Sequence, residues 1–468
     1  MVTEEELKII TADDSNRLLG AEPRSCENTI VEFSGKNNIL YMEKGVHLRN
    51  ARIRFQGDNA LLYLSKSRHR FNADITLETD TACVFGQGIF MNGTDPLRVR
   101  CRKGSTMIMG NDCLLSLGIE IDTWTGERGG EILTQEPESE SILIGQHVWL
   151  GQKVIIKGGS NIRSGAILGS EVTISGQKIP PGTCWGSRNG ELRKVHDHIV
   201  FTRSSIRNTS KEDLWKYDTI SEDQMQEILD RTKNHWKWVQ RMIESESSAE
   251  GRLALLMDST KKRRYKSSRV SKSEERPVHD NQIIGNYKNL DGDSGITFLG
   301  SGNVVILEEG VTLEHTHIAF NGDNSLVYLS KSDSSYRLRV SMHTDTTLYI
   351  GTDNRFAQGK PITFSVAEAQ SVLIGSGCCF GQGIWFRTSD QHPIYDQETR
   401  KRLNQPRSIL IGDFSDLPDD ALIFKGRKIG IKEGGLLKDR YERILEKFQQ
   451  TTDIEERIKL LKKLAKKA

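Results

Sequence analysis

The stretch IGSGCCFGQGIWFRTSDQHPIYD, from Ile374 to Asp396, decides the fold of this chain. Within it, bulky apolar residues recur every six positions, at Ile374, Phe380 and Phe386, with glycine-rich sequence between them. This period fits neither an α-helix, which repeats about every 3.6 residues, nor the alternation of a long strand. It is typical of a parallel β-helix, in which each short strand points one apolar side chain inward and small residues turn the corners.

The same six-residue rhythm is longest in the first half of the chain, and it predicts two complete three-sided coils around an apolar axis. Its members are Ile144, Leu150, Ile156, Ile162, Leu168 and Ile174. Gly145, Gly151 and Gly169 follow column residues, where a tight corner or a positive φ would penalise a Cβ atom. Pro180 and Pro181 are expected to end the ladder, because proline has no N–H to donate.

The chain contains an internal duplication. The segment FQGDNALLYLSKS at 55–67 recurs as FNGDNSLVYLSKS at 320–332, and SILIG at 141–145 recurs at 408–412. Two β-helices in tandem are therefore predicted, with a mainly β fold class. The less regular stretches near 29–80 and 295–345 are interpreted as broader parallel coils of the same two β-helices.

Helical periodicity follows each copy of the β-helix. Ser221 and Gln224 make a capping box at the start of the first helical segment. The predicted domains are a first β-helix at 1–208, a helical segment at 209–262, a basic linker at 263–285, a second β-helix at 286–434 and a helical tail at 435–468. The helices are expected to cap the open ends of the β-helices or to mediate assembly, because an uncapped coil exposes unpaired strand edges.

Composition narrows the classes of function. Sixty-five basic and sixty-three acidic residues give a net charge of +2, so no general attraction to nucleic acid is expected. The first ten residues lack the pattern of a signal peptide, and no apolar stretch approaches a membrane span. The seven cysteines show no CxxC spacing, which favours reduced thiols in a cytoplasm. The basic run from Lys261 to Lys272 is either a flexible linker or a peripheral patch for an anionic polymer or membrane lipid.

The loop at the end of the opening stretch resembles the sugar branch of the hexapeptide-repeat acyltransferases, whose fold is a left-handed parallel β-helix. Thr388, Ser389, Asp390, His392, Pro393 and Asp396 match the TSDxHPxxD loop of that branch. The resemblance implies that His392 is the catalytic base, which takes a proton from a sugar hydroxyl that attacks acetyl-CoA. Asp390 and Asp396 flank it, and are expected to raise its pKa or fix its tautomer. The alternative is a solvated loop histidine.

The first copy has no matching histidine, because Glu127 stands in its place. It is therefore expected to be catalytically silent. It does carry HVWLG and IPP segments like those that line the coenzyme A groove of the family, and the resemblance implies five candidate CoA contacts. These are Trp149, Gly151, Gly169, Ser170 and Lys178. An ordinary packed aromatic is the alternative for Trp149.

The second copy keeps the histidine loop, but its following segment lacks the Trp, the IPP loop and at least one coil. These complementary losses suggest a composite site with His392 from the second copy and donor-binding coils from the first. Decay of one or both sites is the alternative. The family places active sites between three neighbouring β-helices, so a homotrimer is expected. His315 and His317 face one side of a strand, but no third ligand is identifiable, so no metal is expected.

The resemblance thus implies an acetyl-CoA-dependent O-acetyltransferase acting on a sugar hydroxyl of a bacterial surface polysaccharide, such as a capsule or lipopolysaccharide. The competing hypothesis is a catalytically silent tandem β-helix scaffold that assembles polysaccharide-synthesis enzymes.

Overall fold

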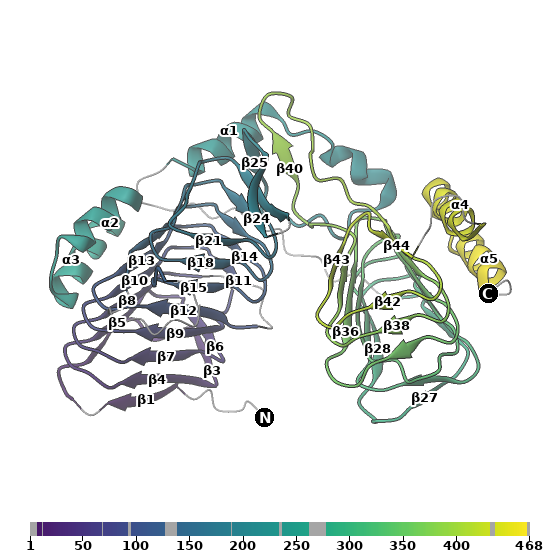
Figure 1. Cartoon of the computed structure of the whole chain (residues 1–468), viewed down its shortest axis with the longest axis horizontal. Helices are drawn as coiled ribbons and strands as arrows, with labels where there is room; N and C mark the ends of the chain where they lie inside the picture. The colour runs from purple at the N-terminus through teal and green to yellow at the C-terminus, as the bar shows by residue number, and fades with distance from the viewer. Residues whose placement is uncertain are drawn as a thin grey trace. The chain divides into compact units, whose positions relative to one another are not determined.

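The computed structural model describes residues 7–11, 13–67, 69–91, 95–126, 138–188, 190–233, 236–261, 278–430 and 436–465. The chain divides into two compact units. Unit 1 comprises Met1–Phe201, Ser221–Arg269 and Asp396–Arg400; unit 2 comprises Thr202–Ile220, Val270–Tyr395 and Lys401–Ala468. Each unit is a stack of short, mainly parallel strands (Figure 1), which confirms the prediction of two parallel β-helices.

Unit 1 has three faces, each made of strands stacked in register. Face 1 contains β1 (Leu7–Thr11), β4 (Thr29–Phe33), β7 (Arg52–Phe55), β9 (Ala73–Leu77), β12 (Leu97–Cys101), β15 (Glu120–Asp122), β18 (Ile155–Lys157) and β21 (Thr173–Ser175). Face 2 contains β2 (Arg17–Gly20), β5 (Ile39–Met42), β8 (Leu61–Leu64), β10 (Ala82–Phe85), β13 (Thr106–Met109), β16 (Ile142–Ile144), β19 (Asn161–Ile162) and β22 (Lys178–Ile179). Face 3 contains β3 (Ser25–Glu27) with β6 (His47–Arg49), then β11 (Phe90–Met91), β14 (Leu114–Leu115), β17 (Trp149–Leu150), β20 (Ile167–Leu168), β23 (Cys184–Arg188) and β24 (Glu191–His196). The strand β25 (Ile199–Phe201) follows.

Unit 2 repeats this arrangement with fewer coils. Its face 1 contains β28 (Gly295–Phe298), β31 (His317–Phe320), β33 (Leu338–Met342), β36 (Ile362–Val366), β39 (Trp385–Arg387) and β43 (Leu422–Phe424). Its face 2 contains β26 (Gln282–Ile284), β29 (Val304–Leu307), β32 (Leu326–Leu329), β34 (Thr347–Ile350), β37 (Ser371–Ile374), β41 (Ile409–Ile411) and β44 (Lys428–Ile429). Its face 3 contains β27 (Tyr287–Asn289) with β30 (Val311–Leu313), and β35 (Arg355–Phe356) with β38 (Cys379–Phe380) and β42 (Asp416–Leu417). The strand β40 (Ile394–Asp396) lies outside these faces.

The six-residue column forms the core of unit 1 as predicted. Its members occupy six successive strands from β16 to β21, and all are at most 1% exposed. Hydrogen bonds between coils join residues 22 apart near the start of the unit and 18 apart near its end. The upstream coils are therefore broader, as the sequence indicated, and the extra residues enlarge the corners.

Close approach between coils explains the glycines that follow the column residues. A Cβ atom on Gly151 would lie 2.6 Å from the carbonyl carbon of Gly169, a distance that packed atoms do not reach. The prediction for the prolines was only partly right. Pro180 and Pro181 end face 2 after β22, but face 3 continues with β23, and β24 then pairs with β23 in antiparallel orientation.

The helices cover flanks rather than ends, so the expectation of end caps was wrong. In unit 1, α2 (Trp236–Glu244) and α3 (Ala249–Lys261) pack on outward apolar side chains of face 2, including Leu61, Tyr63 and Val84. In unit 2, α4 (Leu436–Gln450) and α5 (Ile454–Ala465) pack on the corresponding face. Face 2 carries apolar residues on both of its surfaces, and burial of the outer one favours a helical cover.

One buried arginine joins the helices to the coils in each unit. Arg252 donates to the carbonyl oxygens of Asn59 and Thr81, at 3.2 and 3.3 Å. Arg457 donates to the carbonyl oxygens of Asn324 and Thr346, the equivalent residues of unit 2, at 2.6 and 3.2 Å. In each unit the arginine therefore supplies hydrogen bonds to coil carbonyl oxygens that its helix shields from water.

Two shorter helices complete the described structure: the 3₁₀ helix η1 (Lys211–Tyr217) and α1 (Glu222–Arg231). The predicted capping box is present, since Ser221 accepts a hydrogen bond from the backbone N–H of Gln224 and the Gln224 side chain accepts one in return. No helix in the described ranges has the length and hydropathy needed to cross a bilayer. The basic stretch 261–272, apart from Lys261, lies outside the described residues.

Candidate active site

The loop that carries His392 leaves face 1 of unit 2 directly after β39, and a single amide anchors it. Asn404 donates to the carbonyl oxygen of His392 at 2.8 Å and to the carboxylate of Asp390 at 3.2 Å. The side-chain oxygen of Asn404 accepts from the backbone N–H of Ile394 at 2.8 Å. The backbone is therefore held on both sides of the imidazole, which limits the positions that His392 can take.

A buried ion pair supports the start of the same loop. Arg402 and Glu368 lie 2.8 Å apart, with side chains that are 1% and 0% exposed. Glu368 also accepts a hydrogen bond from the hydroxyl of Ser389, and that hydroxyl accepts from the backbone N–H of Gln391 at 2.7 Å. The residue that precedes His392 is thus connected to a fixed charge pair in the interior.

The segment that enters unit 2 after Phe201 runs beside this loop. Backbone hydrogen bonds from Thr202 to Pro393 and from Ile206 to Gln391, each of 3.0 Å, place the two stretches side by side. This pairing brings Arg203 and Arg207 into the surroundings of His392.

Burial and nearby cations keep the His392 imidazole neutral. Burial lowers the pKa of His392 to about 4; a hydrogen bond with the Ser204 backbone acts in the opposite direction, and Arg207, Arg203 and Arg387 lower it further. A charged imidazole is disfavoured both by lost hydration and by the nearby guanidinium groups. The expectation that neighbouring carboxylates raise this pKa was therefore wrong, because burial and cations dominate.

Both predicted aspartates have other partners. Burial acts to raise the pKa of Asp390, but an ion pair with Lys425, the charge of Arg387 and the bond from Asn404 together lower it. Asp396 accepts hydrogen bonds from the backbone N–H and the hydroxyl of Thr399, both of 2.7 Å, and closes a turn. Asp390 thus belongs to the polar network of the loop, whereas Asp396 is a turn residue.

The five predicted donor contacts lie in unit 1, on two different faces. Trp149 in β17 is 8% exposed and packs near Phe201, with ring centroids 5.7 Å apart. Gly151 and Gly169 stack closely on adjacent coils of that face. The hydroxyl of Ser170 accepts from the backbone N–H of Gln152 at 3.2 Å. Lys178, in contrast, is exposed on β22 of face 2.

These roles do not themselves define a coenzyme A groove, because Trp149 packs near Phe201 and close approach between coils accounts for the two glycines. A cavity of about 310 Å³ lies nearby in unit 1, lined by Pro181, Gly182 and Val200 among others. His147 at its margin bonds to Asp112 at 2.8 Å and to the carbonyl oxygen of Phe201 at 2.9 Å. Both of its ring nitrogens are thus engaged, and His147 supports the wall of this cavity.

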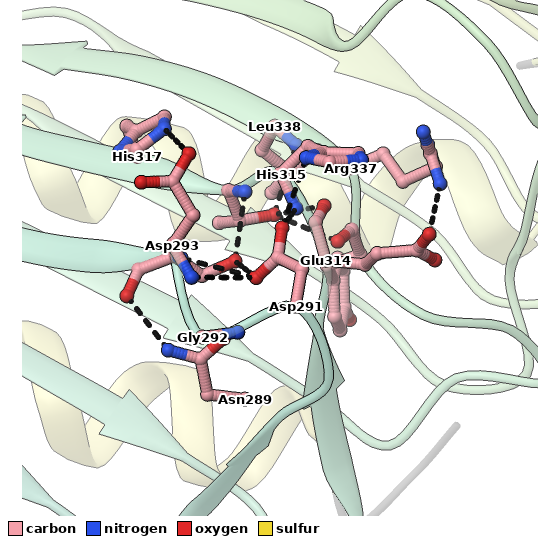
Figure 2. A network of polar contacts seen from close by, with 12 residues as sticks. Asn289, Asp291, Gly292, Asp293, Glu314, His315, His317, Arg337 and Leu338 are labelled. Carbon is pink, nitrogen blue, oxygen red and sulfur yellow. Dashed lines mark hydrogen bonds and ion pairs between the residues drawn. The ribbon is translucent and has the colours of Figure 1, made fainter.

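His315 and His317 each lie beside an aspartate (Figure 2). His315 contacts Asp291 at 3.0 Å, and His317 lies 3.9 Å from Asp293. Asp291 also accepts hydrogen bonds from the backbone N–H groups of Asp293, Ser294 and His315. The described residues contain no group of three histidine, cysteine or acidic side chains arranged to hold a metal ion.

Sequence reasoning missed several residues of the site, namely Arg203, Arg207, Arg387, Glu368, Arg402 and Asn404. Arg387 stands in the quoted stretch, one residue before the TSD motif, so a signal for it existed. Arg203 and Arg207 lie outside both repeats, and their relation to His392 depends on the fold. Glu127, the counterpart of His392 in the first copy, lies outside the described residues.

Comparison with known proteins shows what this chain is similar to. A Polysialic acid O-acetyltransferase of Neisseria meningitidis is 26% identical over 147 residues, which is 31% of this chain and 67% of that protein. A second Polysialic acid O-acetyltransferase, from Escherichia coli O1:K1 / APEC, is 30% identical over 69 residues, 15% of this chain and 20% of that protein. No protein-family profile matches.

Among solved structures, the polySia specific acetyltransferase NeuO matches 43% of this chain and 91% of its own length, with 19% identity and a TM-score of 0.38. The polysialic acid O-acetyltransferase OatWY matches 44% of this chain and 92% of its own, with 20% identity and a TM-score of 0.30. Over 31% of its length this chain is thus similar in sequence to a Polysialic acid O-acetyltransferase, and both of its units are parallel β-helices.

Proposed function

We propose that this protein transfers an acetyl group from acetyl-CoA to a hydroxyl of an acidic bacterial surface polysaccharide, with His392 as the general base. The observation that carries the proposal is the position of His392, which is anchored by Asn404 and surrounded by Arg203, Arg207 and Arg387. Acetyl-CoA supplies the activated acyl group as a thioester.

The lowered pKa of His392, about 4, keeps the imidazole neutral at pH 7. A neutral imidazole has a lone pair that can accept the proton of an attacking hydroxyl. A base with so low a pKa is weak, and a catalytic base works best when its pKa lies near the working pH. Without substrate the pKa of His392 is therefore too low for efficient base catalysis, and a group that binds with the substrate has to raise it.

An acidic acceptor supplies that change. The pKa of Arg207 is lowered by burial and by Arg387, and that of Arg387 is lowered by burial, with Asp390 acting against it. Among the described residues neither arginine has a carboxylate within ion-pair distance, and Asp390 already pairs with Lys425. A carboxylate on the acceptor would offset the guanidinium charges and raise the pKa of His392 toward neutrality. The names of both relatives specify polysialic acid, an acidic polymer, which supports this acceptor class.

The test is acetyl transfer from labelled acetyl-CoA to polysialic acid and to a neutral dextran of similar length. We expect label in the polysialic acid and at least about tenfold less in the dextran, together with release of free CoA. Transfer to both polymers at equal rates would refute the acidic acceptor. Absence of transfer to any of a panel of bacterial polysaccharides, with no protection of the protein against heat by millimolar CoA, would refute the enzyme and favour the scaffold.

A further inference from the structure

The internal duplication matches face 1 of unit 1 with the face that carries the catalytic loop in unit 2. The strands β9, β12 and β15 have the residue numbers of β33, β36 and β39 less 265. In unit 2 the chain passes from β39 into the loop of His392. The equivalent exit in unit 1 follows β15, so the outer surface around β15 is the counterpart of the acceptor side of the working copy.

That surface of unit 1 is hollowed. A groove of about 480 Å³ runs across the outer side of face 1 and is lined by residues from β7 to β21. Its lining includes Arg54, Arg98, Arg100, Glu120, Trp124 and Lys157. A concave surface with an aromatic wall and several fixed polar groups has the character of a ligand site rather than of a solvated sheet.

Trp124 provides the aromatic wall, and its backbone is fixed. Its N–H donates to the carboxylate of Asp122 at 3.0 Å, and its carbonyl oxygen accepts from Gly158 at 2.9 Å. The indole N–H is buried and has no hydrogen-bond acceptor in the described part of the chain. An aromatic ring in the wall of a groove suits a sugar, because its apolar surface can cover the C–H groups of the sugar ring.

The charged residues of the groove are preorganised, and cations are in slight excess. Arg98 pairs with Glu120 at 2.7 Å, and Arg54 pairs with Asp74. These pairs hold their side chains in place while leaving hydrogen-bonding groups for hydroxyls. Lys157 has no carboxylate within ion-pair distance among the described residues, and it adds an unpaired positive charge beside the indole. The groove therefore favours a sugar chain that carries acidic groups.

We propose that the groove on face 1 of unit 1 is a non-catalytic binding site for an acidic polysaccharide, retained on the copy that lacks the histidine. The choice of ligand rests on the proposed function. A polymer held here by one segment raises the local concentration of its other segments for acetylation, as multivalent attachment does in general.

The test is direct binding of polysialic acid to the full chain by isothermal titration calorimetry, without acyl donor, in a His392→Ala background. Trp124→Ala and Lys157→Gln should each weaken binding at least about fivefold, the scale of one lost aromatic or charged contact. Trp238→Ala is the matched control, because Trp238 is 56% exposed on α2 of the same unit, and it should leave the affinity unchanged. Circular dichroism checks folding, and if Trp124→Ala unfolds the chain, Lys157→Gln decides the result.

Binding of the Trp124→Ala or Lys157→Gln variant with the affinity of the unsubstituted groove would overturn the proposal, and so would absence of binding by the parent. Transfer to a short sialic acid oligomer, measured with His392 restored, separates the two claims. If the groove variants transfer the acetyl group normally and bind polysialic acid with unchanged affinity, the groove is not a binding site and the proposed function stands. Weakened binding in the groove variants without transfer by any form refutes the enzyme and leaves a glycan-binding protein.

Discussion

Replacement of Arg402 by methionine should show how far the loop that carries His392 depends on the buried pair with Glu368. The substitution keeps an unbranched side chain of similar length but leaves a carboxylate that is 0% exposed without its cation. Removal of one partner of a buried pair typically costs about 3–5 kcal/mol. Arg402 also donates to the carbonyl and the side-chain oxygens of Asn404, both at 3.3 Å, so loss of these bonds places the expected cost at about 4 kcal/mol.

The assay is urea denaturation followed by intrinsic fluorescence, with Arg339→Met as the matched control because Arg339 is exposed on β33 of the same unit. Adding Glu368→Gln to Arg402→Met removes the isolated charge and should recover about half of the lost stability. In folded Arg402→Met protein, kcat should fall more than KM rises, since the loop that positions His392 loosens. A loss of stability below about 1 kcal/mol, with unchanged kcat, would refute the claim that this pair orders the loop.

Three further predictions concern other contacts. Arg252→Met and Arg457→Met should each destabilise the protein by about 2–3 kcal/mol in thermal unfolding, because two coil carbonyls lose their donor under a helix; equal stability of variant and parent would contradict this. Trp149→Ala should lower the free energy of unfolding by about 3–5 kcal/mol, as expected for a packed buried aromatic. A much smaller loss of stability together with weakened CoA binding would instead support Trp149 as a contact of the acyl donor. Arg207→Gln should raise the pKa of His392 by removing a nearby positive charge, so the acidic fall of kcat/KM should move to higher pH, and an unmoved or lowered limb would remove Arg207 from the site.

Much of the fold could be predicted because a β-helix core repeats in the sequence. Each residue of the column from Ile144 to Ile174 is the inward side chain of one strand, so the spacing of the column predicts the strands. The duplication predicts the same arrangement for unit 2. The docking of the helices was missed, although LLYL at Leu61–Leu64 is apolar on both sides of the strand. That pattern signals a covered face rather than an open one.

The site was only partly predictable, because its chemistry joins segments that no repeat connects. His392 was recognisable from the motif around it. The segment with Arg203 and Arg207 pairs with the loop through backbone hydrogen bonds, which leave no trace in side-chain spacing. The pKa of His392 is set by burial and by this pairing. A prediction from residues adjacent in sequence, Asp390 among them, therefore gave the wrong direction for the pKa shift.

The expected pH dependence of kcat/KM follows from the burial of His392 and the charges around it. With a pKa of about 4, His392 stays neutral at pH 5.5, whereas an ordinary imidazole with a pKa near 6.5 would be about 90% protonated. In the free enzyme, kcat/KM should therefore remain nearly flat from pH 7 to pH 5.5. A tenfold fall across that range would show that burial and the arginines do not hold the pKa of the imidazole down.

The most direct test of the central claim is the rate of labelled acetyl transfer to polysialic acid by the His392→Ala variant. A general base contributes about 10²–10⁴ in rate, so we expect kcat to fall at least about a hundredfold with little change in KM for either substrate. His279→Ala controls for loss of another histidine of unit 2, one whose side chain is 64% exposed, and Glu127→Ala for the equivalent position in the first copy; both should retain activity. Near-normal turnover in His392→Ala, or loss of activity in Glu127→Ala instead, would contradict the assignment of His392 as the catalytic base.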